Sequence, residues 1–383
     1  MPRVAIKPEL VRWAVDRASA DVEELAGRPG LAGLPDWERG EARPTLKQLE
    51  AFAKAVHVPI GYLFLPEPPE ERLPIPDFRT APGVRLGRPS PDLLDTIYAM
   101  QRRQAWLQEM LLDDGADPLE FVGSARLTDA PEAVGREMRR IIGFGDGWAG
   151  EVRTWQEAVS RLRQAIEKLG VMAVINGVVG NNTHRKLEVQ EFRGFALCDT
   201  HAPLIFVNGA DARSAQMFTL VHELAHVWLG SEGVSGFEDL FPRGSRIEEF
   251  CDKAAAEFLV PERELKACWS EVKRAEKPFE DLARRFKVSP IVGGRRAMDL
   301  RLVDREAFFT FYRAYIAEER ARSKGPGGGD FYNNQNTRVG ALFAAHVIRA
   351  ALEGRVGFKE AYDLTGLHGG AFQEYAQRLG FEL

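Results

Sequence analysis

Cysteine and long apolar runs are scarce in this sequence of 383 residues. The cysteines, Cys198, Cys251 and Cys268, are odd in number and widely spaced, which excludes a disulfide framework and suits a reducing compartment. No apolar run approaches the ~20 residues that a transmembrane helix needs. The first ten residues, MPRVAIKPEL, also lack the apolar stretch of a secretory signal. We therefore expect a cytoplasmic protein with no membrane partner.

An excess of charge of one sign is also absent. The chain carries 51 Lys and Arg against 56 Asp and Glu, a formal net charge of −5, so there is no overall basic footprint for nucleic acid. Hydrophobic residues make up 45% of the chain, as in a globular protein that buries a core. At this length, two or three domains are expected.

Hydrophobic periodicity and proline divide the chain into parts. Helical spacing of apolar residues runs through 8–65 and 91–170, and five prolines between Pro66 and Pro76 predict a stiff, extended connector. Three β-branched or aromatic runs, VMAVING, VQEFRGFALCD and PLIFVNG, predict the strands of a small sheet. The fold class is therefore α+β, predominantly helical. Its predicted parts are a helical N-terminal domain (1–65), a proline-rich linker (66–84), a helical connecting region (85–164), a sheet-containing domain (165–305) and a helical C-terminal domain (306–383).

The run VHELAHVWLG contains the pattern HExxH, formed by His222, Glu223 and His226. A helix is predicted at about 211–229, with Asp211 as its N-cap, and positions four apart lie on one face of a helix. Two imidazoles so placed can bind one Zn²⁺, and the glutamate between them can act on a water at the metal. The alternative is a chance match, or two core histidines satisfied by hydrogen bonds. Because the helix is apolar, burying three such groups without a purpose is costly, which favours a metal site.

A catalytic zinc usually has three protein ligands. The segment RIEEFCDKAAAEFLVP, predicted as a helix at about 246–260, places Glu248 and Asp252 on one face. We expect Glu248 to be the third ligand and Asp252 to accept a hydrogen bond from a ligand histidine. Glu249 and Asp252 are alternative ligands and Glu257 a poorer one. Acidic residues here can also simply favour the first turn of a helix.

The predicted site implies peptide hydrolysis. Zinc would lower the pKa of a water toward ~7 and polarise a carbonyl, while Glu223 would take the water's proton and deliver it to the leaving amine. The group that stabilises the oxyanion is left open among His201, Arg243 and Tyr332. An extended substrate could add to the edge of the strand in VQEFRGFALCD through main-chain hydrogen bonds.

These motifs together resemble the ImmA/IrrE family of metallopeptidases. The resemblance covers roughly residues 165–300 and depends on FRGFALCD, on NGADARSAQMFTLVHELAH and on EEFCDKAAAEFLVP. It implies a gluzincin-like site in which His222, His226 and Glu248 bind Zn²⁺ and Glu223 is the general base. Asp252 stands where families of this type show Asn. The resemblance also implies a protein substrate, a DNA-binding repressor or an antitoxin-like regulator, in stress responses, mobile-element control or toxin–antitoxin control.

The N-terminal part resembles a lambda-repressor-like helix-turn-helix domain of the XRE type, through WERG, RPTLKQL, VPIGYLF and PIPDFRT. DNA binding needs a continuous recognition helix with a basic face. The expected stretch, residues 27–40, contains Pro29, Gly30, Gly33 and Pro35, and residues 1–65 hold as many acidic as basic side chains. A degenerate domain kept for packing or dimerisation is therefore an alternative.

A second candidate for DNA contact is the basic helix-turn-helix pattern between Arg284 and Arg301. It is interrupted by Gly293 and Gly294, and arginine-rich helices are more often solvated faces. The leading hypothesis is thus a zinc endopeptidase with a narrow protein substrate. The alternative is an XRE-type transcription regulator or partner-binding protein in which zinc is structural or sensory. A homodimer is a further expectation.

Overall fold

The computed structural model describes residues 2–18, 20–77, 89–235, 245–321 and 336–382. Chain contacts divide the protein into two compact units. Unit 1 comprises Met1–Pro74 and Arg85–Ile97, and unit 2 comprises Ile75–Val84 and Tyr98–Leu383. The architecture is α+β and predominantly helical, as the sequence predicts. The finer division into five parts stays a prediction.

Unit 1 contains a bundle of short helices around its own core. Trp13, Trp37, Leu49 and Phe52 are buried at its centre, and Trp37 meets Phe52 edge to face. Thr45 begins the fourth helix with a capping box to Gln48, which satisfies free backbone groups at the helix start. The described elements are α1 (Pro8–Arg17), α2 (Val22–Ala26), α3 (Leu34–Arg39), α4 (Leu46–Ala55) and η1 (Ile60–Phe64).

The expected recognition stretch, residues 27–40, contains only the six-residue helix α3. Residues 27–33 form turns, and Gly30 and Gly40 adopt positive φ angles of 84° and 78°. Glycine takes this conformation without strain, so Gly30 turns the chain before α3 and Gly40 ends it, which leaves a short helix and not a long one. DNA binding by this unit stays a prediction.

Unit 2 contains a mixed sheet in the strand order β1-β5-β4-β6. Strand β1 pairs parallel with β5, and β4 pairs antiparallel with both β5 and β6. Every residue of β1, β4, β5 and β6 is buried, which explains why the strand residues within the three predicted runs are mainly apolar. The described strands are β1 (Met172–Asn176), β4 (Gly194–Leu197), β5 (Leu204–Asn208), β6 (Gly233–Ser235) and the hairpin of β2 (Val178–Val179) and β3 (Asn182–Lys186).

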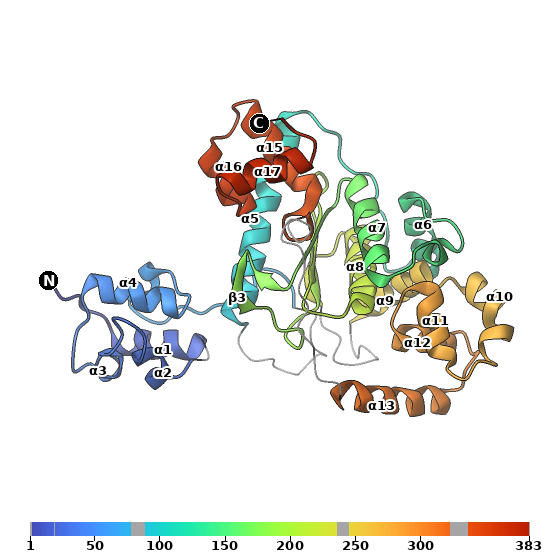
Figure 1. The fold of residues 1–383 in the computed structure, drawn as a ribbon, viewed down its shortest axis with the longest axis horizontal. Helices are drawn as coiled ribbons and strands as arrows, with labels where there is room; N and C mark the ends of the chain where they lie inside the picture. The colour runs from blue at the N-terminus through green and yellow to red at the C-terminus, as the bar shows by residue number, and fades with distance from the viewer. Residues whose placement is uncertain (1, 19, 78–88, 236–244, 322–335, 383) are drawn as a thin grey trace. The chain divides into compact units, whose positions relative to one another are not determined.

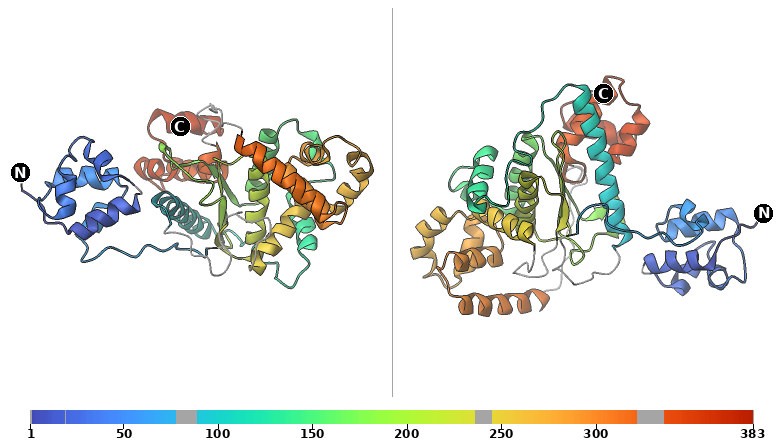
Figure 2. Two further views of the ribbon diagram at one scale, coloured as in Figure 1. Left: turned by 90° about the horizontal axis from the view of Figure 1, so that it is seen from below. Right: turned by 180° about the vertical axis from the view of Figure 1, so that it is seen from behind.

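Helices cover both faces of this sheet (Figures 1 and 2). On one face α7 and α8 pack against the strands, and on the other lies the part of α5 from Tyr98 onward, where Gln104 donates to the carbonyls of Leu197 and Ala202. The described helices are α5 (Pro91–Asp113), α6 (Pro131–Ile142), η2 (Trp148–Glu151), α7 (Trp155–Lys168), α8 (Arg213–Leu229), α9 (Arg246–Leu259), α10 (Glu262–Val272), α11 (Pro278–Phe286), α12 (Pro290–Asp299), α13 (Arg305–Ala321), η3 (Asn336–Gly340), α15 (Ala341–Leu352), α16 (Phe358–Thr365) and α17 (Gly370–Arg378).

Helices α11 and α12 form the helix-turn-helix expected in the basic region. The two glycines inside α12 have a packing role, because a Cβ at Gly293 would lie 3.0 Å from Leu282 Cβ and one at Gly294 would lie 3.2 Å from the rings of Phe279 and Phe308. The basic side chains mostly contact groups of the same chain: Arg284 pairs with Asp281, Arg285 with Glu271, Arg295 with Asp299, Arg296 with Glu257, and Lys287 donates to the Arg284 carbonyl. DNA contact through this region stays a prediction.

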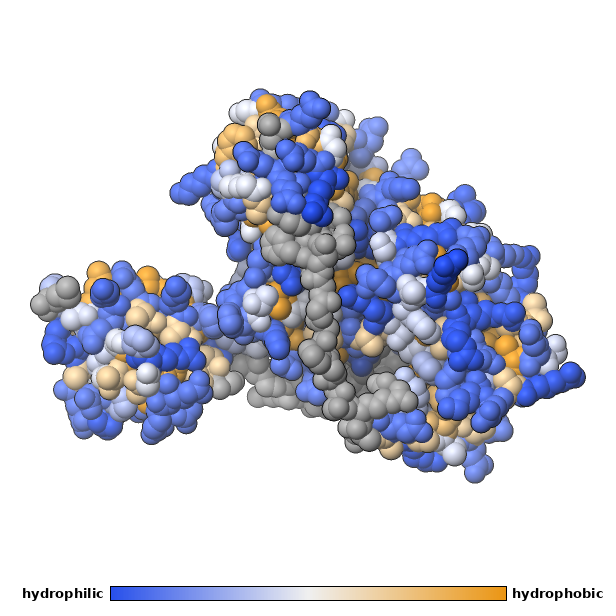
Figure 3. Space-filling model, in the orientation of Figure 1, coloured by the Kyte–Doolittle hydropathy of each residue, from blue (hydrophilic) through white to orange (hydrophobic). Residues whose placement is uncertain are grey.

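The described surface that Figure 3 shows is mainly hydrophilic, with apolar residues in small separate areas. Within the described residues, no helix is both long and apolar enough to cross a membrane.

Candidate metal centre

Helix α8 carries both histidines of the HExxH pattern on one face. It follows β5 through a short turn and begins after Ala212, so the prediction that Asp211 caps it was wrong by one residue. The Asp211 carboxylate instead accepts the N–H of Ala212. His222, Glu223 and His226 have no exposed surface, because the sheet covers α8 on one side and α9 packs against it on another.

Helix α9 brings Glu248 to the two histidines. Ser245 caps this helix and accepts the N–H of Glu248, which fixes the glutamate in the first turn. Its Oε2 lies 3.2 Å from His222 Nε2, and its Oε1 lies 3.0 Å from His226 Nε2. The two Nε2 atoms are themselves 3.2 Å apart. Among the described residues, these three form the single cluster of side chains whose ligand atoms lie close enough together to bind a metal ion.

This donor set fits a zinc ion. Zinc bonds to imidazole nitrogen and carboxylate oxygen are about 2.0–2.2 Å long, and at the tetrahedral angle two such ligand atoms lie about 3.3–3.6 Å apart. The three distances within the group are close to that spacing. Three protein ligands leave one tetrahedral position open, which is the coordination of a catalytic site and not of a closed structural one.

The charges in the group are strongly coupled. Burial lowers the pKa of His226. Burial has the same tendency at His222, but the charge of Glu248 and the hydrogen bond to Asp252 outweigh it and raise the pKa of His222 well above its usual value. Burial tends to raise the pKa of Glu248, yet the two histidines hold it at about 2. The group therefore favours a positive charge among its ligand atoms, which a metal cation provides.

Asp252 lies one turn after Glu248 on α9, behind His222. Its Oδ1 is 3.0 Å from His222 Nδ1, the nitrogen that does not face the other ligands. An acceptor at Nδ1 keeps the proton there and leaves Nε2 free to bind a metal. The expected role of Asp252 as a positioning residue stays a prediction.

Replacing Asp252 by Ala should weaken zinc binding about 10- to 100-fold, the usual effect of losing such a hydrogen-bond partner. Asp252→Asn is the matched control, because its amide oxygen can still accept from His222 Nδ1. Competition against a chelator of known affinity measures both variants. Equal zinc affinity for Asp252→Ala and the wild type would show that the contact does not position His222.

Glu223, the residue after His222, is buried, and its carboxylate lies against the Gly194 end of β4. Among the described residues neither of its oxygens has a hydrogen-bond partner within bonding geometry, and the nearby hydroxyl of Ser235 on β6 only tends to lower its pKa. Burial, only partly offset by the charge of His222, raises the pKa of the Glu223 carboxyl to about 8. A buried carboxylate without a partner is costly for stability, so this residue is well placed to exchange a proton with a bound molecule.

Gly194, the first residue of β4, lies against the candidate site, and the sequence reasoning did not single it out. A Cβ at this position would lie 2.7 Å from Glu223 Oε1, 2.7 Å from Thr219 Cγ2 and 2.8 Å from the Phe206 carbonyl oxygen. Only glycine therefore lets the sheet approach α8 so closely at the carboxylate. The signal was available, since a glycine inside an apolar strand often marks a close approach of another group.

Gly194→Ala should displace the Glu223 carboxylate. We expect a loss of about 1–3 kcal/mol in the free energy of unfolding, as for other overpacked sites, together with reduced hydrolysis. Urea denaturation and an activity assay measure the two effects. Gly150→Ala is the control, because no atom lies within 4 Å of a Cβ there. If both variants are as stable and active as the wild type, the close approach at Gly194 has no functional importance.

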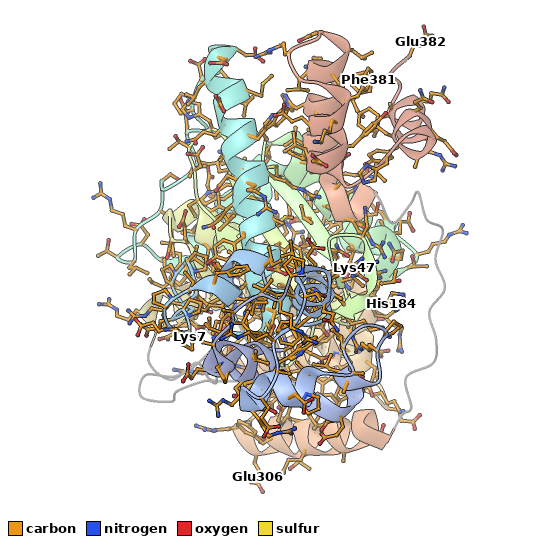
Figure 4. All side chains as sticks on the ribbon, turned by 90° about the vertical axis from the view of Figure 1, so that its left-hand side faces the viewer. Lys7, Lys47, His184, Glu306, Phe381 and Glu382 are labelled. Atoms are coloured by element: carbon orange, nitrogen blue, oxygen red, sulfur yellow. The ribbon has the colours of Figure 1, made fainter. Side chains whose placement is uncertain are left out.

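The structure assigns other contacts to the alternative ligands. Glu249 is exposed and pairs with Lys253, and Glu257 is buried between Arg296 and Arg136. His184 lies on the exposed strand β3, labelled in Figure 4, and not with the ligand histidines.

Of the three candidates for an oxyanion donor, the structure describes only His201. His201 lies beyond Leu197, the last residue of β4, and its ring contacts the Thr200 hydroxyl. Glu223 lies at the opposite end of β4, beside Gly194. Arg243 and Tyr332 lie outside the described residues. The donor therefore stays open.

The expected docking edge of β4 is wrong, because β4 has neighbours on both sides. Strand β5 pairs with one edge and β6 with the other, where Gly194 faces Ser235 and Phe195 faces Val234. Strand β6 follows α8 in the sequence and has only three residues, which explains why the sequence did not reveal it. The outer strand beside the site is thus β6.

A cavity of about 670 Å³ lies beside the metal group. Phe218 and Thr219 of α8 and Asp252 of α9 form part of its wall, and Tyr312 and Ile316 of α13 form another part. Asp252 lines the cavity and also contacts His222, so only this side chain separates the cavity from His222 at that point.

Comparison with known protein families agrees with this geometry. Residues 166–298 match the family model of the IrrE N-terminal-like domain, a peptidase family. The match begins before β1 and ends within α12, so it includes the candidate ligands His222, His226 and Glu248. It supports a metallopeptidase-type hydrolase at the level of the family. Residues 339–378 match a domain of unknown function. Neither the curated proteins nor the solved structures gave a match to this chain.

Proposed function

We propose that the protein is a zinc-dependent endopeptidase that cleaves a specific regulatory protein. The observation that carries this proposal is the arrangement of the four buried side chains. His222, His226 and Glu248 converge on one point, while the Glu223 carboxylate lies beside them without a hydrogen-bond partner among the described residues. A structural metal site would require the first three residues but has no use for the fourth.

The chain's residues divide the chemistry between them. His222, His226 and Glu248 would hold the zinc ion, and Asp252 orients His222. When bound, zinc polarises the substrate carbonyl and acidifies a water. Glu223 would accept the water's proton and deliver it to the leaving amine.

Burial of the site favours a narrow substrate range. The exposed fraction is zero for both histidines and 5% for Glu248, so a folded protein surface does not reach them. An extended peptide segment could enter the neighbouring cavity of about 670 Å³, which a folded domain could not. Together with the resemblance to proteins that act on repressors, this supports a flexible segment of a DNA-binding repressor or an antitoxin-like regulator as the substrate.

A comparison of cleaved proteins in the host tests this proposal. Cells that produce the wild type should accumulate two fragments of one or a few regulatory proteins, and cells that produce Glu223→Gln should retain these proteins intact. Terminal peptides identified by mass spectrometry would name the substrate. Identical peptide patterns in both strains, under conditions in which the wild type has a biological effect, would contradict the peptidase proposal.

A further inference from the structure

The outer edge of β6 is occupied by a segment of the same chain. Val234, in the middle of β6, donates its N–H to the carbonyl of Pro76 at 2.9 Å, and Asp77 forms a parallel β-bridge with Val234. The segment Ile75–Asp77, which we call the connector strand, belongs to the proline-rich stretch that joins the N-terminal helices to the remainder of the chain. Neither metal binding nor catalysis explains this contact.

The occupied edge lies next to the proposed catalytic group. Ser235 follows Val234 directly, and its hydroxyl is close to the Glu223 carboxylate. Ser235 also pairs with Gly194, where an added Cβ would collide with Glu223 Oε1. A peptide paired with Val234 would therefore lie one strand away from Gly194 and next to the residue whose hydroxyl is near the carboxylate.

The connector strand has the features of a weakly held peptide ligand. Ile75 is 5% exposed and anchors the segment, whereas Pro76 and Asp77 are exposed. A proline lacks the N–H that a longer ladder would use, so the contact contains few main-chain hydrogen bonds. Such a strand can be replaced by a longer peptide that offers a full set of donors.

We propose that the edge of β6 at Val234 is the docking site for an extended substrate peptide, and that the connector strand occupies it in cis until a substrate replaces it. The preferred substrate would place a large apolar side chain where Ile75 lies, followed by residues that remain exposed. This inference rests on the proposed peptidase function, because it assigns the substrate position and the regulation of the same site. Release of the connector strand would then increase peptide binding.

Hydrogen exchange of the full chain tests the contact without any need for hydrolysis. In the wild type the Val234 amide should be protected, and Ile75→Asp should expose it by placing a charge in the apolar anchor position. The control is Pro74→Asp, which adds the same charge and removes a proline one residue earlier, at an exposed position. Protection of the amides within α8 and α9 from exchange shows that each variant is folded. If Ile75→Asp does not fold, Ile75→Ser is a milder second variant.

Peptide binding completes the test. The probe is a fluorescent peptide with the sequence of residues 70–77, EERLPIPD, measured by anisotropy on zinc-loaded chains that also carry Glu223→Gln. We expect at least 10-fold tighter binding to the Ile75 variant than to the chain with Ile75 or to the Pro74→Asp control, and restored protection of Val234 when the peptide is bound. A peptide with Asp in place of its isoleucine should not bind.

Two outcomes would overturn the inference: unchanged protection of Val234 in both Ile75 variants, or equal affinity of the probe with and without Ile75. Neither depends on catalysis. A failure of the proposed function would instead appear as absent hydrolysis in chains that retain Glu223, whatever the exchange result.

Discussion

Replacing Glu223 by Gln is expected to reduce hydrolysis by about 10²- to 10⁴-fold, the usual contribution of a general acid–base group. Glutamine has nearly the same shape but cannot accept the proton, so the change should appear in kcat more than in KM. Zinc should remain bound, because Glu223 is not among the three residues that converge on the metal position. The substrate identified in the host provides the assay, and metal analysis of the same sample provides the second measurement.

The stability of this variant gives an independent indication of function. Glu223 is completely buried, and neither of its oxygens has a hydrogen-bond partner among the described residues. Removing such a group should leave the free energy of unfolding unchanged or increase it, as is common for residues kept for activity and not for folding. Glu249→Gln is the matched control, because Glu249 is an exposed carboxylate of α9 that pairs with Lys253. Activity of Glu223→Gln within twofold of the control would exclude Glu223 as the base.

Replacing His222 by Ala is expected to remove both zinc and hydrolysis. The variant lacks one of the three proposed ligands. It also removes the imidazole whose nitrogens lie 3.2 Å from a carboxylate oxygen of Glu248 and 3.0 Å from one of Asp252. Treatment of the wild type with a chelator should have the same effect on hydrolysis, and added zinc should restore only the wild type. The exposed His184 provides the control substitution.

Zinc should also stabilise the folded protein. An ion that binds only the folded state at 100 times its dissociation constant adds about 2.7 kcal/mol to the free energy of unfolding. Thermal unfolding with and without zinc should show this difference in the wild type and in His184→Ala, but not in His222→Ala. A wild type that remains fully active after verified removal of divalent metal would contradict the metal assignment.

The helix-borne parts of the site were predictable from sequence. In HExxH the spacing alone places His222 and His226 on one face, and the acidic residues at the start of α9 pointed to Glu248. The structure brings these residues together as expected, and it places Asp252 against His222 Nδ1. Periodicity is informative here because all four side chains belong to two helices.

The parts that depend on the sheet were not predictable. Strand β6 has three residues, too few to give a pattern, so the sequence left β4 at an edge that β6 in fact covers. The bridge between Asp77 and Val234 joins segments far apart in the chain, and no local signal indicates it. Gly194 had a local signal, but its meaning required the position of the Glu223 carboxylate on another element.

X-ray absorption at the zinc edge, measured on the purified full-length protein, tests the central claim most directly. We predict about one zinc per chain, coordinated only by nitrogen and oxygen at about 2.0–2.2 Å, with two imidazole ligands. In His226→Ala the imidazole contribution should decrease by half or the metal should be lost. A protein without bound metal, or zinc bound through sulfur at about 2.3 Å, would contradict the assignment of His222, His226 and Glu248 as the metal site.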